Sequence, residues 1–374
     1  MKFINKPFSF DIGVFTSCFM FWSSIYCFIV LFFETISLSV FSGVLLTIIV
    51  LLTYGTLWSV AVPQPDPALV KEILGSDPKL MRFRKSNSSL SGEEEQVEDD
   101  KEYFTVIGHR GAGLDAPENS LSAIRQCHDK GCKAVEFDLV LTADGVPVLF
   151  HDDTVDRITN SSGVVQQMTW DQLRALDISE KHPLQERFIG ERVPLFSDVI
   201  KLCLELDMRM IIDVKDESTK TVEVILAAFK EHPKLYKRAI VSGFNPFLIY
   251  MVRSKDPGIV CSLAWRPYYY SLSSYGRDVA SVRRHSGVLA HVVACAADVL
   301  GTWLLTHVGY HTLGLSAVLL HKDVITSDLI AAWEKKKVRV IAWTVNRPQE
   351  KVFFRHILQV AYITDTLVSE TTLQ

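Results

Sequence analysis

The sequence predicts an α/β protein, a (β/α)8 barrel preceded by N-terminal transmembrane helices. Two observations predict this architecture. Residues 12–33 and 35–65 contain no charged side chain, whereas residues 103–374 alternate short apolar runs with helical patterns. A chain of 374 residues has room for both parts, because a barrel of this type uses roughly 250 residues.

The charge balance argues against a nucleic-acid partner. Lysine and arginine total 39 against 43 acidic residues, which gives a formal net charge of -4, and a polyanion is bound by a basic surplus. The seven cysteines form no Cys-x-x-Cys pair and are too few for a disulfide framework in a chain of this length. The sequence predicts no particular protein partner or oligomeric state.

Residues 1–65 are predicted to form a membrane anchor of one or two transmembrane helices. At about 1.5 Å per residue, residues 12–33 make a helix of roughly 33 Å, which is enough to cross the hydrocarbon core. Residues 35–62 are equally apolar and end at a proline-rich segment. The alternative is a cleaved signal peptide, whose apolar region is shorter, about 7–15 residues.

The side of the membrane is left open by two opposing signals. Basic residues flank the anchor at Lys2, Lys6, Lys71, Lys79, Arg82, Arg84 and Lys85. By the positive-inside rule they place both ends of the anchor in the cytosol. Asn87 and Asn160 each begin an Asn-x-Ser triplet, which is glycosylated only on the lumenal or extracellular side.

A charged flexible linker is predicted over residues 66–102. Its last part, residues 86–102, holds seven acidic residues and one lysine, and like charges that repel one another keep a segment extended. The barrel then occupies residues 103–374.

Eight short apolar runs are predicted as the strands of the barrel. They lie at residues 104–108, 134–140, 210–214, 239–242, 259–263, 316–319, 338–345 and 360–363. Strands that alternate with helices form a parallel sheet, since each crossover returns the chain to the same edge. In such a barrel the functional residues gather where the strands end.

Polar motifs follow these strands in a fixed order. They are His109-Arg110-Gly111, Pro117-Glu118-Asn119, Glu136-Phe137-Asp138, His151-Asp152, Asp213-Val214-Lys215, Trp343-Thr344-Val345-Asn346 and Thr364-Asp365. The combined set resembles the glycerophosphodiester phosphodiesterase family over residues 104–369, and most closely its membrane-bound glycerophosphoinositol phosphodiesterases of animals. The resemblance implies a TIM-like barrel, and together with the Asn-x-Ser triplets it favours the lumenal or extracellular side of the plasma membrane or an endomembrane.

A divalent cation on Glu136, Asp138 and Asp213 is implied by the resemblance. The residues themselves support it, because positions i and i+2 of a strand face the same side and adjacent carboxylates repel unless a cation neutralises them. Oxygen ligands suit Mg²⁺, which we favour, or Ca²⁺, rather than zinc. Many relatives have Glu-x-Lys where this chain has Asp213-Val214-Lys215, so Asp213 reaches less far. The alternative for Glu136 and Asp138 is a salt-bridged strand end.

Acid and base chemistry by His109 and His151 is implied in the same way, with Arg110 and Lys215 on the substrate phosphate. A phosphodiester repels an attacking oxygen, so fixed cations are needed beside it. Histidine titrates near neutrality and can take or give the proton that each step moves. The sequence leaves open which histidine is the acid. It also leaves open whether water attacks directly or a glycerol hydroxyl first closes a cyclic phosphate.

Three further residues are predicted at the edge of the site. The resemblance places Glu118 beside the metal or among its ligands, whereas its position before a helix also suits capping, as does that of Asn119. Trp343 and Asn346 are predicted to line the substrate pocket. The alternative for Trp343 is that it packs against the strand ends.

The resemblance implies hydrolysis of a glycerophosphodiester, with glycerophosphoinositol favoured, to sn-glycerol 3-phosphate and an alcohol. A lysophospholipase D that acts on lysophospholipids or N-acyl glycerophosphoethanolamines is the alternative within the same chemistry. A non-catalytic membrane adaptor is the alternative of another class.

A second apolar region, residues 287–320, is predicted to belong to the barrel. A transmembrane helix here carries Asp298 at a cost of about 2.5–3.5 kcal/mol, and it separates strands that must pair. We therefore predict an outer helix over residues 287–308, with a face that rests on the membrane. The aromatic run at residues 265–270 suits the same interface, and an extended barrel loop is the alternative.

Overall fold

The structure is a computed structural model that describes residues 20–26, 29–30, 38–75, 105–216, 218–276, 280–368 and 370. The chain divides into two compact units, Met1–Val60 and Ala61–Gln374. In the first unit, helix α2 (Leu38–Ser59) lies within the second predicted span. The helix has 22 residues, and Val44–Ser59, the part of it whose side chains are described, is an apolar segment shorter than a membrane span. The first predicted span is described only at residues 20–26 and 29–30, so the anchor stays a prediction.

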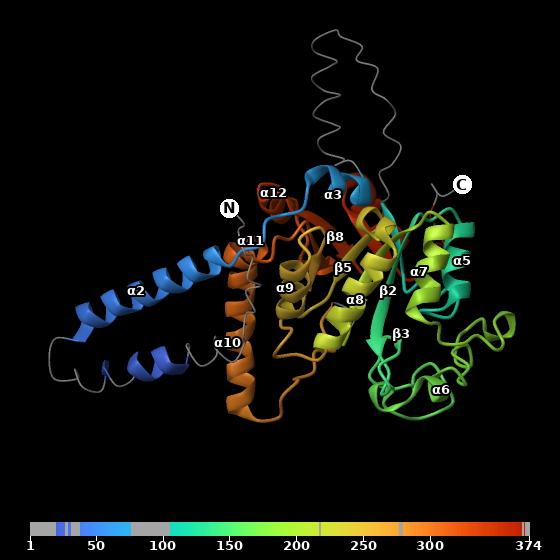
Figure 1. Cartoon of the computed structure of the whole chain (residues 1–374), viewed down its shortest axis with the longest axis horizontal. Helices are drawn as coiled ribbons and strands as arrows, with labels where there is room; N and C mark the ends of the chain where they lie inside the picture. Colours follow the sequence, from blue (N-terminus) through green and yellow to red (C-terminus); the bar gives the residue numbers. More distant parts are fainter. Residues whose placement is uncertain are drawn as a thin grey trace, which may run out of the picture. The chain divides into compact units, whose positions relative to one another are not determined.

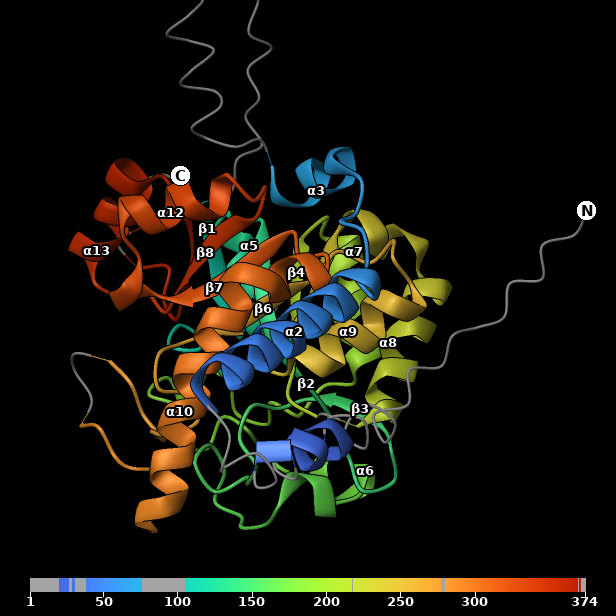
Figure 2. The same ribbon diagram turned by 90° about the vertical axis from the view of Figure 1, so that its left-hand side faces the viewer.

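The second unit is a parallel β-barrel (Figures 1 and 2). Its strands are β1 (Val106–His109), β2 (Ala134–Leu141), β4 (Arg209–Val214), β5 (Ala239–Ser242), β6 (Ser262–Trp265), β7 (Ala317–His321), β8 (Arg339–Trp343) and β9 (Ala361–Thr364). They follow the order β5-β4-β2-β1-β9-β8-β7-β6. Each of the eight predicted apolar runs supplies one of these strands, so the predicted eight-stranded barrel is confirmed.

The barrel is nearly closed between β5 and β6. A single parallel bridge joins Val241 to Cys261, and Val241 N donates to Val260 O at 3.0 Å. This contact uses Val260 and Cys261, which lie in the predicted run at 259–263 just before β6 begins at Ser262. The short strand β3 (Pro147–Leu149) lies outside the barrel order and forms an antiparallel hairpin with β2.

Helices cross between the strands and cover the barrel. They are α5 (Leu121–Asp129), α7 (Phe196–Glu205), α8 (Thr219–Glu231), α9 (Pro246–Lys255), α10 (Val288–Leu304), α12 (Ser327–Glu334) and α13 (Pro348–Val352). Their apolar faces bury one core against the outside of the sheet. A second core fills the barrel with small and branched side chains such as Ile107, Ala134 and Ile341. This packed interior leaves the strand ends as the place for a site.

The start of the predicted linker differs from the prediction. Residues 67–74 form helix α3 (Pro67–Leu74), which Asp66 caps by accepting from Ala68 N at 2.8 Å. Ile73 and Leu74 are buried in the core inside the barrel. Arg339, the first residue of β8, donates to Gly75 O at 3.2 Å. The helix therefore closes the barrel end where the strands begin, because its apolar face is buried there against the core inside the barrel. Residues 76–104 lie outside the described residues.

A buried arginine joins the start of the second unit to the barrel. The side chain of Arg253 on α9 is fully buried. It donates to the carbonyl oxygens of Pro63 and Pro257 and, at 2.8 Å, to that of Ile259. Burial lowers the pKa of Arg253. Three backbone carbonyls, two of them in the segment that follows α9, thus depend on one guanidinium.

We predict that Arg253→Met destabilises the protein by about 2–3 kcal/mol, because buried carbonyls are left without a donor. The measurement is the midpoint of urea unfolding followed by circular dichroism. Lys255→Met, at an exposed position of the same helix, is the matched control and should leave the midpoint unchanged. Equal midpoints for the two variants would contradict this role for Arg253.

Candidate active site

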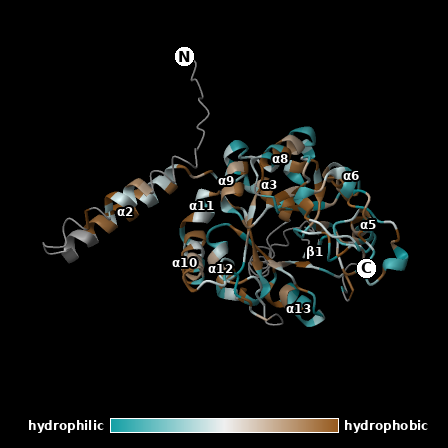
Figure 3. Cartoon of the chain, turned by 90° about the horizontal axis from the view of Figure 1, so that it is seen from below, coloured by the Kyte–Doolittle hydropathy of each residue, from teal (hydrophilic) through white to brown (hydrophobic). Residues whose placement is uncertain are grey.

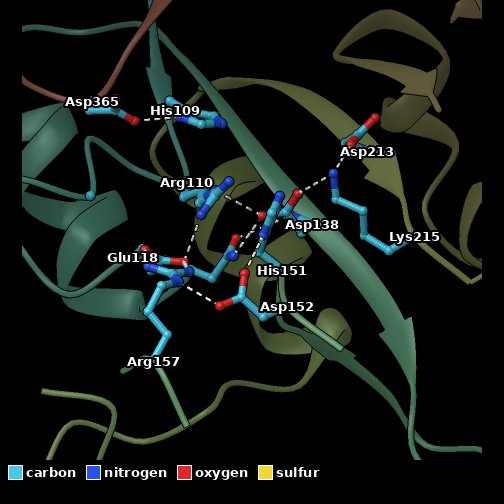
Figure 4. A network of polar contacts seen from close by, with 12 residues as sticks. His109, Arg110, Glu118, Asp138, His151, Asp152, Arg157, Asp213, Lys215 and Asp365 are labelled. Atoms are coloured by element: carbon cyan, nitrogen blue, oxygen red, sulfur yellow. Dashed lines mark hydrogen bonds and ion pairs between the residues drawn. The ribbon is translucent and has the colours of Figure 1, made fainter. Parts of the chain in front are cut away.

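A tight turn after β1 presents the first pair of predicted site residues. Arg110 and Gly111 both have positive φ, 54° and 81°. A Cβ on Gly111 would lie 2.7 Å from the Cβ of Ala123, so only glycine fits between the turn and α5. Ala112 N closes the turn by donating to His109 O at 2.9 Å. Figure 4 shows Arg110 turned toward Glu118 and Asp138.

Strand register brings the predicted metal ligands together. Asp138 on β2 is directly opposite Asp213 on β4, and Glu136 points to the same side of β2 two residues earlier. One oxygen from each of Glu136, Asp138 and Asp213 lies within 4.8 Å of the others, and all three residues are buried. The structure therefore forms the acidic cluster that the sequence predicts.

Two cations contact this cluster. Lys215 Nζ lies 2.5 Å from Asp213 Oδ2 and 3.1 Å from Asp138 Oδ1. Arg110 Nε lies 3.3 Å from Asp138 Oδ2. The alternative of a salt-bridged strand end is therefore correct in part. The salt bridges are present, but the cations come from the ends of β1 and β4 and not from β2 itself.

The balance of charge differs among the three carboxylates. Burial, together with the charges of Asp138 and Asp213, raises the pKa of Glu136 well above its usual range. Burial acts in the same direction on Asp138, but Lys215 and Arg110 outweigh it and lower the pKa of Asp138. For Lys215, burial acts to lower the pKa, yet Asp213 and Asp138 raise it overall. The cluster therefore has unbalanced negative potential at Glu136.

The acidic cluster fits a divalent cation. Its donors are carboxylate oxygens only, the set that Mg²⁺ and Ca²⁺ prefer. Asp213 Oδ1 is buried and accepts no hydrogen bond among the described residues. A cation beside this oxygen also offsets the repulsion that raises the pKa of Glu136.

Glu118 and Asn119 contribute to the site rather than to a helix cap. Ser120 caps α5 by accepting from Ala123 N at 3.0 Å. Asn119 Nδ2 donates to Asp138 Oδ2 at 2.8 Å, and Asp138 N donates back to Asn119 Oδ1 at 3.1 Å. Glu118 Oε1 accepts from Arg110 Nη1 at 2.8 Å. The capping alternative for these two residues is therefore wrong.

His109 is held by a carboxylate from the last strand. Because Gly108 pairs with Thr364, the next residues, His109 and Asp365, come side by side, and Asp365 hydrogen-bonds His109 Nδ1. Asn346 Nδ2 donates to Asp365 Oδ2 at 2.6 Å. Burial acts to raise the pKa of Asp365, but the hydrogen bond and charge of His109 lower it to about 2. The ring is thereby fixed with Nε2 3.8 Å from Glu136 Oε2.

His151 is held by a second carboxylate. Its Nδ1 lies 2.6 Å from Asp152 Oδ1. Arg157 Nε donates to Asp152 Oδ2 at 2.5 Å, and Arg157 Nη1 donates to Glu118 Oε2 at 2.8 Å. A chain of polar contacts thus links His151 through Arg157 and Glu118 to Arg110 (Figure 4).

Some residues of this network were not predicted as site residues. Asp365 and Asp152 belong to the motifs Thr364-Asp365 and His151-Asp152, so their positions carried a signal. Arg157 lies in a loop with no pattern around it. Asn346 was predicted to line a pocket, and the structure uses its amide to hold Asp365.

Aromatic side chains gather near the ends of β5, β7 and β8. Trp343 Nε1 donates to Leu319 O at 3.0 Å, and its ring packs edge-on against Phe244 at 5.8 Å and against His321 at 5.2 Å between centroids. Tyr269 stacks on Phe244 at 4.8 Å, and Arg266 lies over the Tyr269 ring. We call Phe244, Tyr269, His321 and Trp343 the aromatic wall.

A barrel with carboxylates, fixed cations and two carboxylate-held histidines at its strand ends is suited to hydrolysis of an anionic ester. Residues 109–368 match the glycerophosphoryl diester phosphodiesterase family. The chain is 36% identical over 277 residues to glycerophosphodiester phosphodiesterase 1 of Bos taurus, covering 74% of this chain and 82% of that protein. It is 34% identical to the Homo sapiens protein of that name, with the same coverage.

Solved structures agree on the fold. A phosphodiesterase from Oleispira antarctica, in complex with the product sn-glycerol-3-phosphate, superposes with a TM-score of 0.55 at 21% identity, over 70% of this chain and 92% of that one. A glycerophosphoryl diester phosphodiesterase structure from Silicibacter pomeroyi gives 0.52 at 24% identity, over 70% and 90%. The chain belongs to the glycerophosphodiester phosphodiesterase family and is a phosphoric diester hydrolase. The predicted family is confirmed.

A buried carboxylate joins the two loops that hold His109. Asp115 accepts from Thr366 Oγ1 at 2.6 Å and from Leu367 N at 2.8 Å, and it pairs with Lys130 at 2.8 Å. Burial acts to raise the pKa of Asp115, but these donors lower it overall. A group with a lowered pKa in the folded state stabilises the fold above its ordinary pKa, near 4, and the stabilisation is lost as the pH falls.

We predict that Asp115→Asn lowers the free energy of unfolding by about 1–3 kcal/mol at neutral pH. The difference from the unmodified protein should shrink below about pH 4, where the carboxylate is protonated in the unfolded chain. Urea unfolding across this pH range measures both effects. Asp171→Asn removes a carboxylate that is 78% exposed and should change stability little. A constant difference at all pH values would argue against the ionised form of Asp115.

Proposed function

We propose that the enzyme hydrolyses glycerophosphodiesters, with glycerophosphoinositol favoured, to sn-glycerol 3-phosphate and an alcohol, with the help of one divalent cation. The observation that carries the proposal is the convergence of the acidic cluster with two histidines and two fixed cations at one set of strand ends. A non-catalytic adaptor has no use for this arrangement, and the family membership makes the chain an enzyme.

Glu136, Asp138 and Asp213 are proposed to hold the cation, with Mg²⁺ favoured and Ca²⁺ possible by ligand chemistry. When bound, it supplies positive charge that polarises a phosphoryl oxygen. Asp213 is one methylene shorter than glutamate, but its direct opposition to Asp138 across the β2–β4 ladder keeps it within reach. Its unpartnered Oδ1 supports a ligand role.

Arg110 and Lys215 are proposed to bind the phosphate. Both already lie against the carboxylates, so their positions are fixed before substrate arrives, which lowers the cost of ordering them. Lys215 Nζ has three protons and contacts two carboxylates, which leaves a donor for a phosphate oxygen. Glu118 holds Arg110 through Nη1, and it is proposed as a positioning residue beside the metal rather than a ligand.

His109 and His151 are proposed to move the protons. Each ring has its Nδ1 on a carboxylate, so each keeps Nε2 for exchange with the substrate. One imidazole takes a proton from the attacking oxygen, and the other gives one to the leaving alkoxide. The carboxylates Asp365 and Asp152 hold the rings and stabilise the imidazolium that forms.

The aromatic wall is proposed to receive the alcohol part of the substrate. It stands at the ends of β5, β7 and β8. Strand β5 is the neighbour of β4, whereas β7 and β8 lie across the barrel from the acidic cluster on β2 and β4. Flat apolar rings with a neighbouring arginine suit a sugar-like ring or an acyl chain. The second candidate function, a lysophospholipase D for lysophospholipids or N-acyl glycerophosphoethanolamines, is favoured by this same wall.

The location is proposed to be a membrane. Residues 1–65 are proposed to serve as the anchor, and the enzyme is proposed to face the lumen or the outside. Asn160 is exposed, which is consistent with glycosylation, and Asn87 lies outside the described residues.

We predict that a chelator abolishes hydrolysis of glycerophosphoinositol and that Mg²⁺ or Ca²⁺ restores it. Glu136→Gln should lower kcat/KM on the order of 10³-fold, because a bound cation contributes several kcal/mol to stabilising the transition state. The assay measures glycerol 3-phosphate release from a panel of water-soluble and acylated glycerophosphodiesters, and the preferred member identifies the alcohol group. Glu205→Gln, an exposed position on α7, is the control. Full activity of Glu136→Gln would refute the proposal.

We predict that Asp365→Asn lowers kcat by about 10²–10⁴-fold with little change in KM, because the amide no longer holds the His109 ring in the right tautomer or stabilises its charged form. Steady-state kinetics on the preferred diester give both constants. Asp328→Asn, an exposed carboxylate on α12, should leave both unchanged. A rise in KM alone would instead place Asp365 in substrate binding.

A further inference from the structure

Helix α10 is the unusual element of the barrel. With η4 (Leu305–Gly309) and α11 (Tyr310–Thr312) it continues for 25 residues, and by length and composition Val288–Thr312 is the one helix among the described residues that could cross a membrane. Most of it is exposed (Figure 3 shows α10 largely hydrophobic).

The sheet excludes a transmembrane position for this helix. The strands on either side of it, β6 and β7, pair in parallel from Ser262–Ala317 to Trp265–Leu320. Both ends of the helix therefore return to the same barrel, on one side of any bilayer. Asp298, inside the helix, is buried and accepts from the backbone N–H groups of Tyr270 and Ser271 at 2.8 and 3.0 Å. The helix is thus fixed to the loop that follows β6.

One face of α10 is apolar and uncovered. Its large side chains are between 48% and 78% exposed: Val288, Leu289, Val292, Val293, Val299, Leu300 and Trp303. At 3.6 residues per turn they fall on one side of the helix, opposite Ala294 and Asp298, which are buried. We call these seven residues the α10 apolar face.

The surroundings of this face match a lipid surface. Between residues 280 and 321 the only acidic residue is Asp298, which is buried. Arg283 and Arg284 come just before the helix, and both are exposed. Tyr268 and Tyr270, in the loop that Asp298 holds, are 54% and 42% exposed. Exposed aliphatic residues bordered by tyrosine, tryptophan and arginine are typical of a helix that lies in the membrane interface.

We propose that the α10 apolar face lies in the lipid–water interface of an anionic bilayer, parallel to the surface and without crossing it. The loop tied to α10 by Asp298 carries Tyr269 of the aromatic wall, so this contact holds the alcohol side of the barrel mouth beside the lipid. Diesters with an acyl tail then reach the site without leaving the membrane. The membrane contact itself does not depend on catalysis, whereas the access of acylated diesters rests on the proposed function.

The test uses the full chain in vesicles of phosphatidylcholine and phosphatidylserine, with and without bromine on the acyl chains. A fluorescent label is attached at Val292→Cys in a Cys18→Ser, Cys27→Ser, Cys295→Ser background. The matched label is at Lys230→Cys, an exposed position of α8. Because the label reports on its own position, binding through residues 1–65 does not produce the signal.

We expect brominated lipids to quench the label at position 292 by about twofold and the label at 230 hardly at all. Leu289→Glu should reduce the quenching at 292 toward the control. Equal quenching at 292 and 230 overturns the proposal. So does a label at 292 that is unquenched and crosslinks to a second copy or to the N-terminal unit, because another occupant then covers the face. Hydrolysis of a water-soluble diester on the same sample tests the proposed function separately.

Discussion

The structure depends on bringing three carboxylates together inside a closed sheet. Glu136, Asp138 and Asp213 repel one another, and burial makes the repulsion stronger. The protein offsets this repulsion with two cations. Lys215 follows β4, the strand that carries Asp213, and Arg110 lies in the turn after β1 in the left-handed conformation. A site that is held together by added positive charge is suited to a further cation and to an anionic group beside it.

Strand register explains how much of this was predictable. The alternation of apolar runs predicted all eight strands, and the i, i+2 spacing predicted that Glu136 and Asp138 share a face. Which residues meet across neighbouring strands depends on the register, and a single sequence does not contain it. The pairings of Asp138 with Asp213 and of Gly108 with Thr364 decide that a third carboxylate joins the cluster and that Asp365 meets His109.

The residues that the sequence left out belong to loops. Arg157 bridges Asp152 and Glu118 from a loop with no periodic pattern, and no local rule identifies it. Helix α3 was assigned to the linker, whose last part is an acidic tract, although its own residues have the spacing of an amphipathic helix. Its partner is the open end of the barrel, which only the folded sheet creates.

The same distinction between composition and topology applies to α10. A hydropathy criterion treats Val288–Thr312 as a membrane span because it weighs the side chains and ignores what precedes and follows them. The parallel pairing of β6 with β7 excludes a membrane span. The buried Asp298, which accepts hydrogen bonds from two backbone N–H groups, also argues against it. An apolar helix that is required by the sheet to stay on one side, and that is not covered by the barrel, has an interface as its remaining low-energy environment. The free energy gained by burying the α10 apolar face in lipid is then available to orient the barrel mouth. In this proposal, helix α10, which resembles a second anchor, controls how substrate reaches the site.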